Sequence, residues 1–197
     1  MMKDTPLISC SDPAASALQT AEFLKKSGAV ALVPTETVYG LVARVGDEEA
    51  FKKIFELKQR SSAKVLGWFA ADPGDLEACG VELKGLPEQL IAKYCPGPIT
   101  IIAPMKDGRT LGFRFPDHPF LRELLKLTGP LYQTSANLSG QPDPKDVSSA
   151  LEELSGSPDI AVDGGRLPEN ACGSTVVDAT GTEIKILRQG ALTVTLP

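Results

Sequence analysis

Apolar residues recur at helical spacing in five stretches of the chain. In the first stretch Ala17, Ala21 and Leu24 fall on one helical face, and the preceding Asp12 and Pro13 suit a helix start. The spacing predicts helices over residues 14–24, 48–58, 86–94, 120–127 and 147–154.

Short apolar runs between turn residues predict strands. They cover residues 29–33, 65–71, 99–103, 111–115, 131–134, 174–178 and 184–187. Because strands and helices mix without strict alternation, we expect an α/β protein of the α+β type, with a twisted mixed sheet and flanking helices. No internal repeat or long linker divides the sequence, so residues 1–197 are expected to form a single domain.

Composition narrows the class of protein. No apolar run approaches the ~20 residues that span a bilayer, and the N-terminus lacks the apolar core of a signal peptide. We therefore expect a cytoplasmic protein with no membrane partner. The formal net charge of −5 argues against a nonspecific nucleic-acid binder, although a small anionic ligand needs only a local basic cleft.

Cysteine and histidine usage limits the chemistry further. The cysteines are Cys10, Cys79, Cys95 and Cys172. They form no Cys-x-x-Cys pair, so we expect reduced, buried thiols rather than a disulfide framework or a metal site. His118 is the only histidine, and its place just before a predicted helix favours a helix start over a catalytic triad.

The sequence holds neither common nucleotide-binding loop, G-x-x-x-x-G-K-[ST] or G-x-G-x-x-G after a strand. A nucleotide would therefore be held by side-chain cations and hydroxyls. Lys58, Arg60 and Lys64 place three cations within seven residues where a helix passes to a strand. Such a cluster suits a triphosphate and a leaving pyrophosphate, although cations at a helix end also complement the helix dipole.

Polar residues mark two further places. Thr35 follows strand 29–33, where α/β proteins tend to bind ligands, although an ordinary polar turn is the alternative. Ser135 and Asn137 follow strand 131–134, where they would bind a ligand or form local turn hydrogen bonds. Arg114 stands between two phenylalanines in a strand and should need a partner unless it faces the surface.

Six short motifs occur in a fixed order along the chain. They are residues 34–41 (PTETVYGL), 57–60 (LKQR), 96–100 (PGPIT), 134–140 (TSANLSG), 173–178 (GSTVVD) and 186–191 (ILRQGA). Together they resemble the motifs of the YrdC-type threonylcarbamoyl-AMP synthases in their short, single-domain form. The resemblance implies a YrdC-like fold with an open concave cleft and without the extra C-terminal domain of long members.

The resemblance also implies an activity. It is that of a nucleotidyltransferase forming threonylcarbamoyl-AMP and pyrophosphate from L-threonine, bicarbonate and ATP, for the threonylcarbamoyl-adenosine modification of tRNA. Magnesium would accompany ATP, with no tightly bound cofactor and no built-in metal site, since no carboxylate cluster is present. The product would pass to a downstream tRNA threonylcarbamoyl transferase complex, and a weak contact with RNA is compatible with this role.

The same resemblance assigns roles to individual residues. The catalytic group would be Lys58, Arg60, Ser135 and Asn137. The ATP-binding residues would be Lys58, Arg60, Lys64, Thr110, Asn137 and Arg188. The threonine-binding residues would be Thr35, Arg114, Ser135 and Ser174.

Four positions depart from the family's pattern, namely Val42, Ser61, Phe69 and Lys145. The departures at Val42, Phe69 and Lys145 keep open a second interpretation, a YrdC-fold RNA-binding or regulatory paralogue without synthase activity. The joint presence of the four catalytic residues favours the enzyme.

Overall fold

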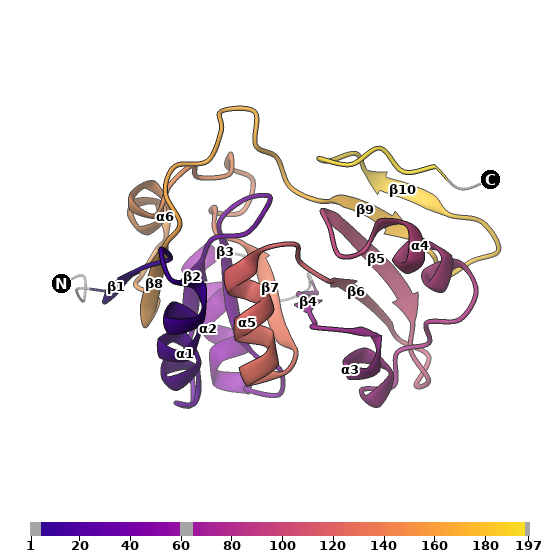
Figure 1. Ribbon diagram of the computed structural model, residues 1–197, viewed down its shortest axis with the longest axis horizontal. Helices are drawn as coiled ribbons and strands as arrows, with labels where there is room; N and C mark the ends of the chain where they lie inside the picture. The colour runs from indigo at the N-terminus through magenta and orange to yellow at the C-terminus, as the bar shows by residue number, and fades with distance from the viewer. Residues whose placement is uncertain (1–4, 60–64, 196–197) are drawn as a thin grey trace.

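The computed structural model describes residues 5–59 and 65–195, which form a sheet flanked by helices (Figure 1). The helices of this part are α1 (Pro13–Leu24), α2 (Glu48–Lys58), α3 (Pro73–Ala78), α4 (Leu86–Tyr94), α5 (Pro119–Thr128) and α6 (Val147–Glu153). Its strands are β1 (Leu7–Ser9), β2 (Ala31–Val33), β3 (Gly40–Arg44), β4 (Gly67–Phe69), β5 (Ile99–Pro104), β6 (Thr110–Arg114), β7 (Leu131–Ser135), β8 (Ile160–Asp163), β9 (Thr175–Asp178) and β10 (Lys185–Arg188).

The strands of the described residues form one mixed sheet. Their order is β1-β8-β2-β3-β7-β4-β6-β5-β9-β10. The pairs β1/β8, β2/β8, β4/β6 and β5/β9 are parallel, and the other pairs are antiparallel. The predicted mixed sheet with flanking helices is confirmed.

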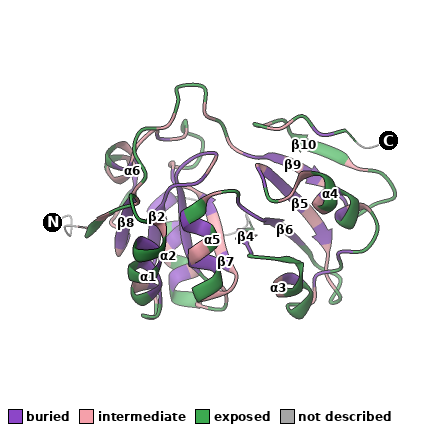
Figure 2. Cartoon of the chain, in the orientation of Figure 1, coloured by how far each residue is buried: buried purple, intermediate pink, exposed green. Residues whose placement is uncertain are grey.

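The half of the sheet around β2 and β3 is covered by helices on both faces, as the contacts of the β2 residues show. Ala31 and Val33 belong to a cluster with residues of α1 and α5, whereas Leu32 belongs to a cluster with residues of α2 and α6. Alternate residues of a strand point to opposite faces, so a strand covered on both sides is apolar throughout. All three residues of β2 are accordingly buried, and Figure 2 shows the buried strands behind the partly exposed helices α1 and α5.

The other half of the sheet differs between its two faces. Ile101, Phe113 and Val177 are paired across β5, β6 and β9, and they pack against residues of α3 and α4. Their neighbours Ile102 and Gly112 point to the opposite face and line a cavity there. This alternation separates a helix-covered core from a surface that is open to ligands.

Local sequence explains where the helices begin and end. The N-cap side chains Asp12, Asp47, Asp72 and Asp146 accept hydrogen bonds from first-turn N–H groups. At the other end of α2, Gln59 takes a left-handed conformation with φ 47° and stops the helix at Lys58.

Every helix and strand predicted from the sequence is present, with each end shifted by at most two residues. The strands β1, β3 and β8 and the helix α3 are not predicted. All four cysteines are free, but Cys79 and Cys172 are exposed, so the expectation of buried thiols is wrong for these two. In the described residues, no helix is long and apolar enough to cross a bilayer.

Candidate functional site

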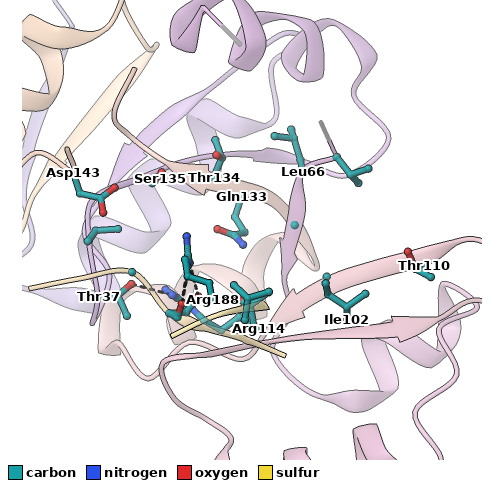
Figure 3. A pocket seen from close by; sticks show the side chains of 18 residues that line it. Thr37, Leu66, Ile102, Thr110, Arg114, Gln133, Thr134, Ser135, Asp143 and Arg188 are labelled. Atoms are coloured by element: carbon teal, nitrogen blue, oxygen red, sulfur yellow. Dashed lines mark hydrogen bonds between the residues drawn. The ribbon is translucent and has the colours of Figure 1, made fainter. Parts of the chain in front are cut away.

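A cavity of about 460 Å³ lies over the face of β4, β5, β6 and β9 that carries Ile102 and Gly112 (Figure 3). This volume falls within the ~300–1,000 Å³ of small-molecule sites. Five of the predicted site residues line it, namely Thr110, Arg114, Ser135, Ser174 and Arg188. The sheet therefore brings together residues that lie up to 78 positions apart in the sequence.

Arg114 is the most buried charged group of the cavity, with 4% of the residue exposed. Its Nη1 donates to Thr37 Oγ1 at 2.9 Å, and its Nη2 donates to Glu36 Oε2 at 3.3 Å. The guanidinium lies 4.7 Å from the centre of the Phe69 ring. Burial lowers the pKa of Arg114, and the Glu36 carboxylate opposes that shift. The surface-facing alternative for Arg114 is thus excluded.

The turn between β2 and β3 presents Thr37 to the cavity and keeps Thr35 behind it. The Thr35 hydroxyl donates to Val38 O at 2.7 Å and accepts from the backbone N–H groups of Thr37 and Val38 at 3.0 and 3.1 Å. Thr35 is 4% exposed and is not among the residues that line the cavity. Here Thr35 shapes the turn, and its predicted contact with threonine stays a prediction.

Lys58 joins the end of α2 to the segment after β7. Its Nζ donates to Ser135 O, to Asn137 O at 2.6 Å and to Asn137 Oδ1 at 3.2 Å. The Ser135 hydroxyl also donates to Asn137 Oδ1, at 2.6 Å. Three of the four predicted catalytic residues therefore form one hydrogen-bonded group, in which Ser135 reaches the cavity and the buried Lys58 lies behind it.

The far wall of the cavity is built by β9 and β10. Arg188 donates to Ser174 O from Nε at 3.1 Å and from Nη2 at 2.9 Å. The hydroxyls of Ser174 and Thr100 lie 2.7 Å apart. These contacts place Ser174 and Arg188 side by side. Since Ser174 is expected to bind threonine and Arg188 to bind ATP, the two expected sites adjoin here.

Arg60 and Lys64, predicted to bind ATP, lie outside the described residues, as does the departure at Ser61. Of the other departures, Phe69 lies under Arg114, and Lys145 Nζ donates to Ala171 O at 2.8 Å. Val42 is fully buried in β3, within the cluster of α1 and α5. Among the described residues, no group of three or more His, Cys, Asp or Glu side chains could hold a metal ion.

Five polar residues to which the sequence analysis gave no role also line the cavity: Thr37, Thr100, Gln133, Thr134 and Asp143. Figure 3 shows the Asp143 carboxylate, the Gln133 amide and the Arg188 guanidinium around the same space as Ser135. Thr100 had a signal in the sequence, because Ile99, Ile101 and Ala103 form the opposite, apolar face of its strand. Asp143 had none, since it lies in a loop without periodicity.

The site can be compared with those of known proteins. The family model of Sua5, YciO and YrdC proteins, which carries the description telomere recombination, matches residues 23–190. The chain is a member of this family. The resemblance drawn from the six motifs is thereby confirmed.

Several members of the Sua5/YciO/YrdC family are similar over most of this chain. A Methanocaldococcus jannaschii protein is 32% identical over 87% of this chain and 86% of its own length. The threonylcarbamoyl-AMP synthase of Pyrococcus abyssi is 35% identical over 87% of this chain, which spans 53% of that relative. The solved structure of P. abyssi Sua5 complexed with L-threonine has a TM-score of 0.85 and 30% identity, covering 96% of this chain and 58% of that one.

Proposed function

We propose that this chain is an L-threonylcarbamoyladenylate synthase. It acts as a nucleotidyltransferase, using L-threonine, bicarbonate and ATP to form threonylcarbamoyl-AMP and pyrophosphate in the cytoplasm. Magnesium would arrive with ATP as part of the substrate. The product is consumed by a tRNA threonylcarbamoyl transferase complex.

The strongest support is a cavity with a buried arginine at one side and the Lys58-held segment of Ser135 and Asn137 at the other. A guanidinium grips a carboxylate with two parallel hydrogen bonds, which suits Arg114 to the carboxylate of an amino acid. The P. abyssi relative, whose solved structure contains L-threonine, has the same fold.

The reaction places few demands on the protein beyond positioning and charge. The amine of threonine and bicarbonate form a carbamate with release of one water molecule, and an oxygen of this carbamate attacks the α-phosphorus of ATP. As that O–P bond forms, the bond to the pyrophosphate oxygen breaks, and the leaving group gains negative charge. Cations and N–H or O–H donors fixed in advance stabilise this charge, and Arg188 and Ser135 line the cavity where they can do so.

The alternative of an RNA-binding or regulatory paralogue without synthase activity is not favoured. Relatives named threonylcarbamoyl-AMP synthase come from archaea, bacteria and human. The departures at Val42, Phe69 and Lys145 leave Arg114, Ser135 and the rest of the cavity lining in place.

The test is product analysis with ATP, bicarbonate and labelled threonine. We expect threonine-dependent release of pyrophosphate and a labelled adenylate, with no release when threonine or bicarbonate is omitted. Threonine-dependent formation of ADP and orthophosphate would contradict the proposal, because it would mean cleavage at the γ-phosphate.

A further inference from the structure

Buried polar atoms without partners gather behind the cavity. In the described part of the chain four buried side-chain atoms lack a hydrogen-bond partner: Glu36 Oε1, Arg114 Nε, His118 Nδ1 and Glu153 Oε2. The first three belong to one neighbourhood, since Arg114 donates to Glu36 and His118 interacts electrostatically with both. A buried polar atom without a partner lowers stability, so a cluster of them indicates a constraint other than stability.

Glu36 is the only acid that contacts the Arg114 guanidinium among the described residues. The other contacts of the guanidinium are uncharged. Nη1 donates to the hydroxyl of Thr37, and the guanidinium lies over the face of the Phe69 ring. The Glu36 side chain is 15% exposed, beside 5% for Arg114, so water screens the pair little. Arg114 lines the cavity, whereas Glu36 does not.

We propose that Glu36 is a positioning residue, which holds the Arg114 guanidinium in the orientation that receives the carboxylate of threonine. This inference rests on the proposed function. A guanidinium buried without a counter-charge would be costly and would turn toward water. The Glu36 carboxylate prevents this by accepting one hydrogen bond from Nη2, while Arg114 still lines the cavity, as a residue orienting a ligand-binding group does elsewhere.

A residue that acts through another has a specific signature. Removing the charge of Glu36 should weaken the binding of threonine, which meets Arg114, and should leave the binding of ATP close to its original value. Once Arg114 is replaced, the charge of Glu36 should matter little for threonine. The two substitutions should therefore be strongly non-additive.

The test is a double-mutant cycle with Glu36→Gln, Arg114→Lys and the double variant, in which threonine and ATP are titrated separately by calorimetry. Glu36→Gln should weaken threonine binding about 10-fold or more, the scale known for residues that orient a binding group. In the Arg114→Lys background the same change should alter threonine binding less than about twofold. Glu36→Asp, which keeps the charge on a shorter stem, should fall between wild type and Glu36→Gln. Glu22→Gln, on the exposed face of α1, is the matched control.

Additive effects of the two substitutions would overturn the inference, and so would an equal loss of ATP affinity in Glu36→Gln. If Glu36→Gln does not fold, a folded Glu36→Asp variant with wild-type threonine affinity would overturn it instead. A wild-type protein that binds no threonine contradicts the proposed function itself. Wild-type binding that Glu36→Gln leaves intact contradicts only the role of Glu36.

Discussion

At the scale of single residues, two buried cations organise the site in different ways. Arg114 lines the cavity while its guanidinium is held by Thr37 and Glu36, so it is placed to meet a ligand. Lys58, which is 2% exposed, directs its ammonium to the backbone and side-chain oxygens of Ser135 and Asn137. The first cation is suited to recognition and the second to holding the segment after β7 in place.

Arg114→Lys tests the first role. Lysine keeps the charge but cannot form two parallel hydrogen bonds to a carboxylate. Weakening one partner of a desolvated charge pair costs ~2–5 kcal/mol, so threonine affinity should fall strongly while ATP affinity changes little. Calorimetric titration of each ligand separates the two effects, with the exposed Arg122→Lys as the control. A loss confined to ATP would assign Arg114 to the nucleotide site.

Lys58→Met tests the second role. A cation at a helix end usually contributes only ~1 kcal/mol to stability. Because Lys58 is buried, we expect its removal to cost more than this. Methionine fills similar space but cannot donate to the oxygens of Ser135 and Asn137. Each buried polar group left unsatisfied lowers the stability by about 1–3 kcal/mol. Urea unfolding should show this loss, and kcat/KM should fall by roughly 100-fold or more.

The exposed Lys52→Met, on the same helix, should change neither quantity appreciably. Near-normal turnover of Lys58→Met, together with unchanged stability, would remove Lys58 from the functional group. Arg60, its predicted companion, lies outside the described residues.

At the scale of elements, β6 carries the site because its two faces differ. Leu111 and Phe113 pack into the core with α3 and α4, while Gly112 and Arg114 face the cavity. A Cβ at Gly112 would lie 3.6 Å from Thr100 Cγ2 and 3.7 Å from Ile102 Cγ1, which is ordinary contact. The packing of the strand therefore does not require a glycine at position 112. The missing side chain leaves space in the cavity that a ligand can fill.

Gly112→Val should separate binding from stability. Valine suits a strand, so the free energy of unfolding should change by less than about 1 kcal/mol. Its methyl groups would occupy the cavity beside Gly67, and ligand affinity should fall. Calorimetry and urea unfolding on the same samples check this, with Gly112→Ala as the smaller step. Unchanged affinity for both ligands would mean that this part of the cavity is not used.

The sequence predicts long and periodic elements well and short ones poorly. Helices α2 and α4 have the predicted bounds because apolar periodicity and local caps agree there. β1 has three residues and α3 has six, too few to display a period. β3 and β8 lie in the doubly covered half of the sheet, where a strand shows no alternation. Of the cavity residues, Asp143 was missed because only the fold brings its loop over the sheet.

At the scale of the whole molecule, the two halves of one continuous sheet differ: one half forms most of the core, and the other carries the cavity. The half around β2 and β3 buries both faces and supplies most of the packing. The half around β5 and β6 buries one face, and the other is left for polar residues that a core would not tolerate. The turn between β2 and β3 carries Glu36, the connection between β6 and α5 carries His118, and both side chains interact with Arg114.

His118 links this arrangement to the stability of the molecule. It is the only histidine, and burial lowers its pKa, opposed by Glu36 and Asp117 and assisted by Arg114. An unfolded histidine titrates near 6.5, so as pH falls through that value the unfolded chain takes up a proton before the folded protein does. The linked stability is fully present above pH ~6.5 and declines as the pH falls toward the lower folded pKa.

We therefore expect the free energy of unfolding to fall when the pH is lowered from about 7.5 to about 5.5, with a smaller fall in His118→Gln. Urea unfolding of wild type and His118→Gln across this pH range gives the change in the free energy of unfolding for each protein. The carboxylates common to both proteins contribute equally, so subtracting one change from the other leaves the contribution of His118. Proton NMR of the single imidazole gives the folded pKa directly. An imidazole that titrates at or above 6.5 in the folded protein would contradict the prediction, because the histidine would then gain rather than resist a proton in its buried position.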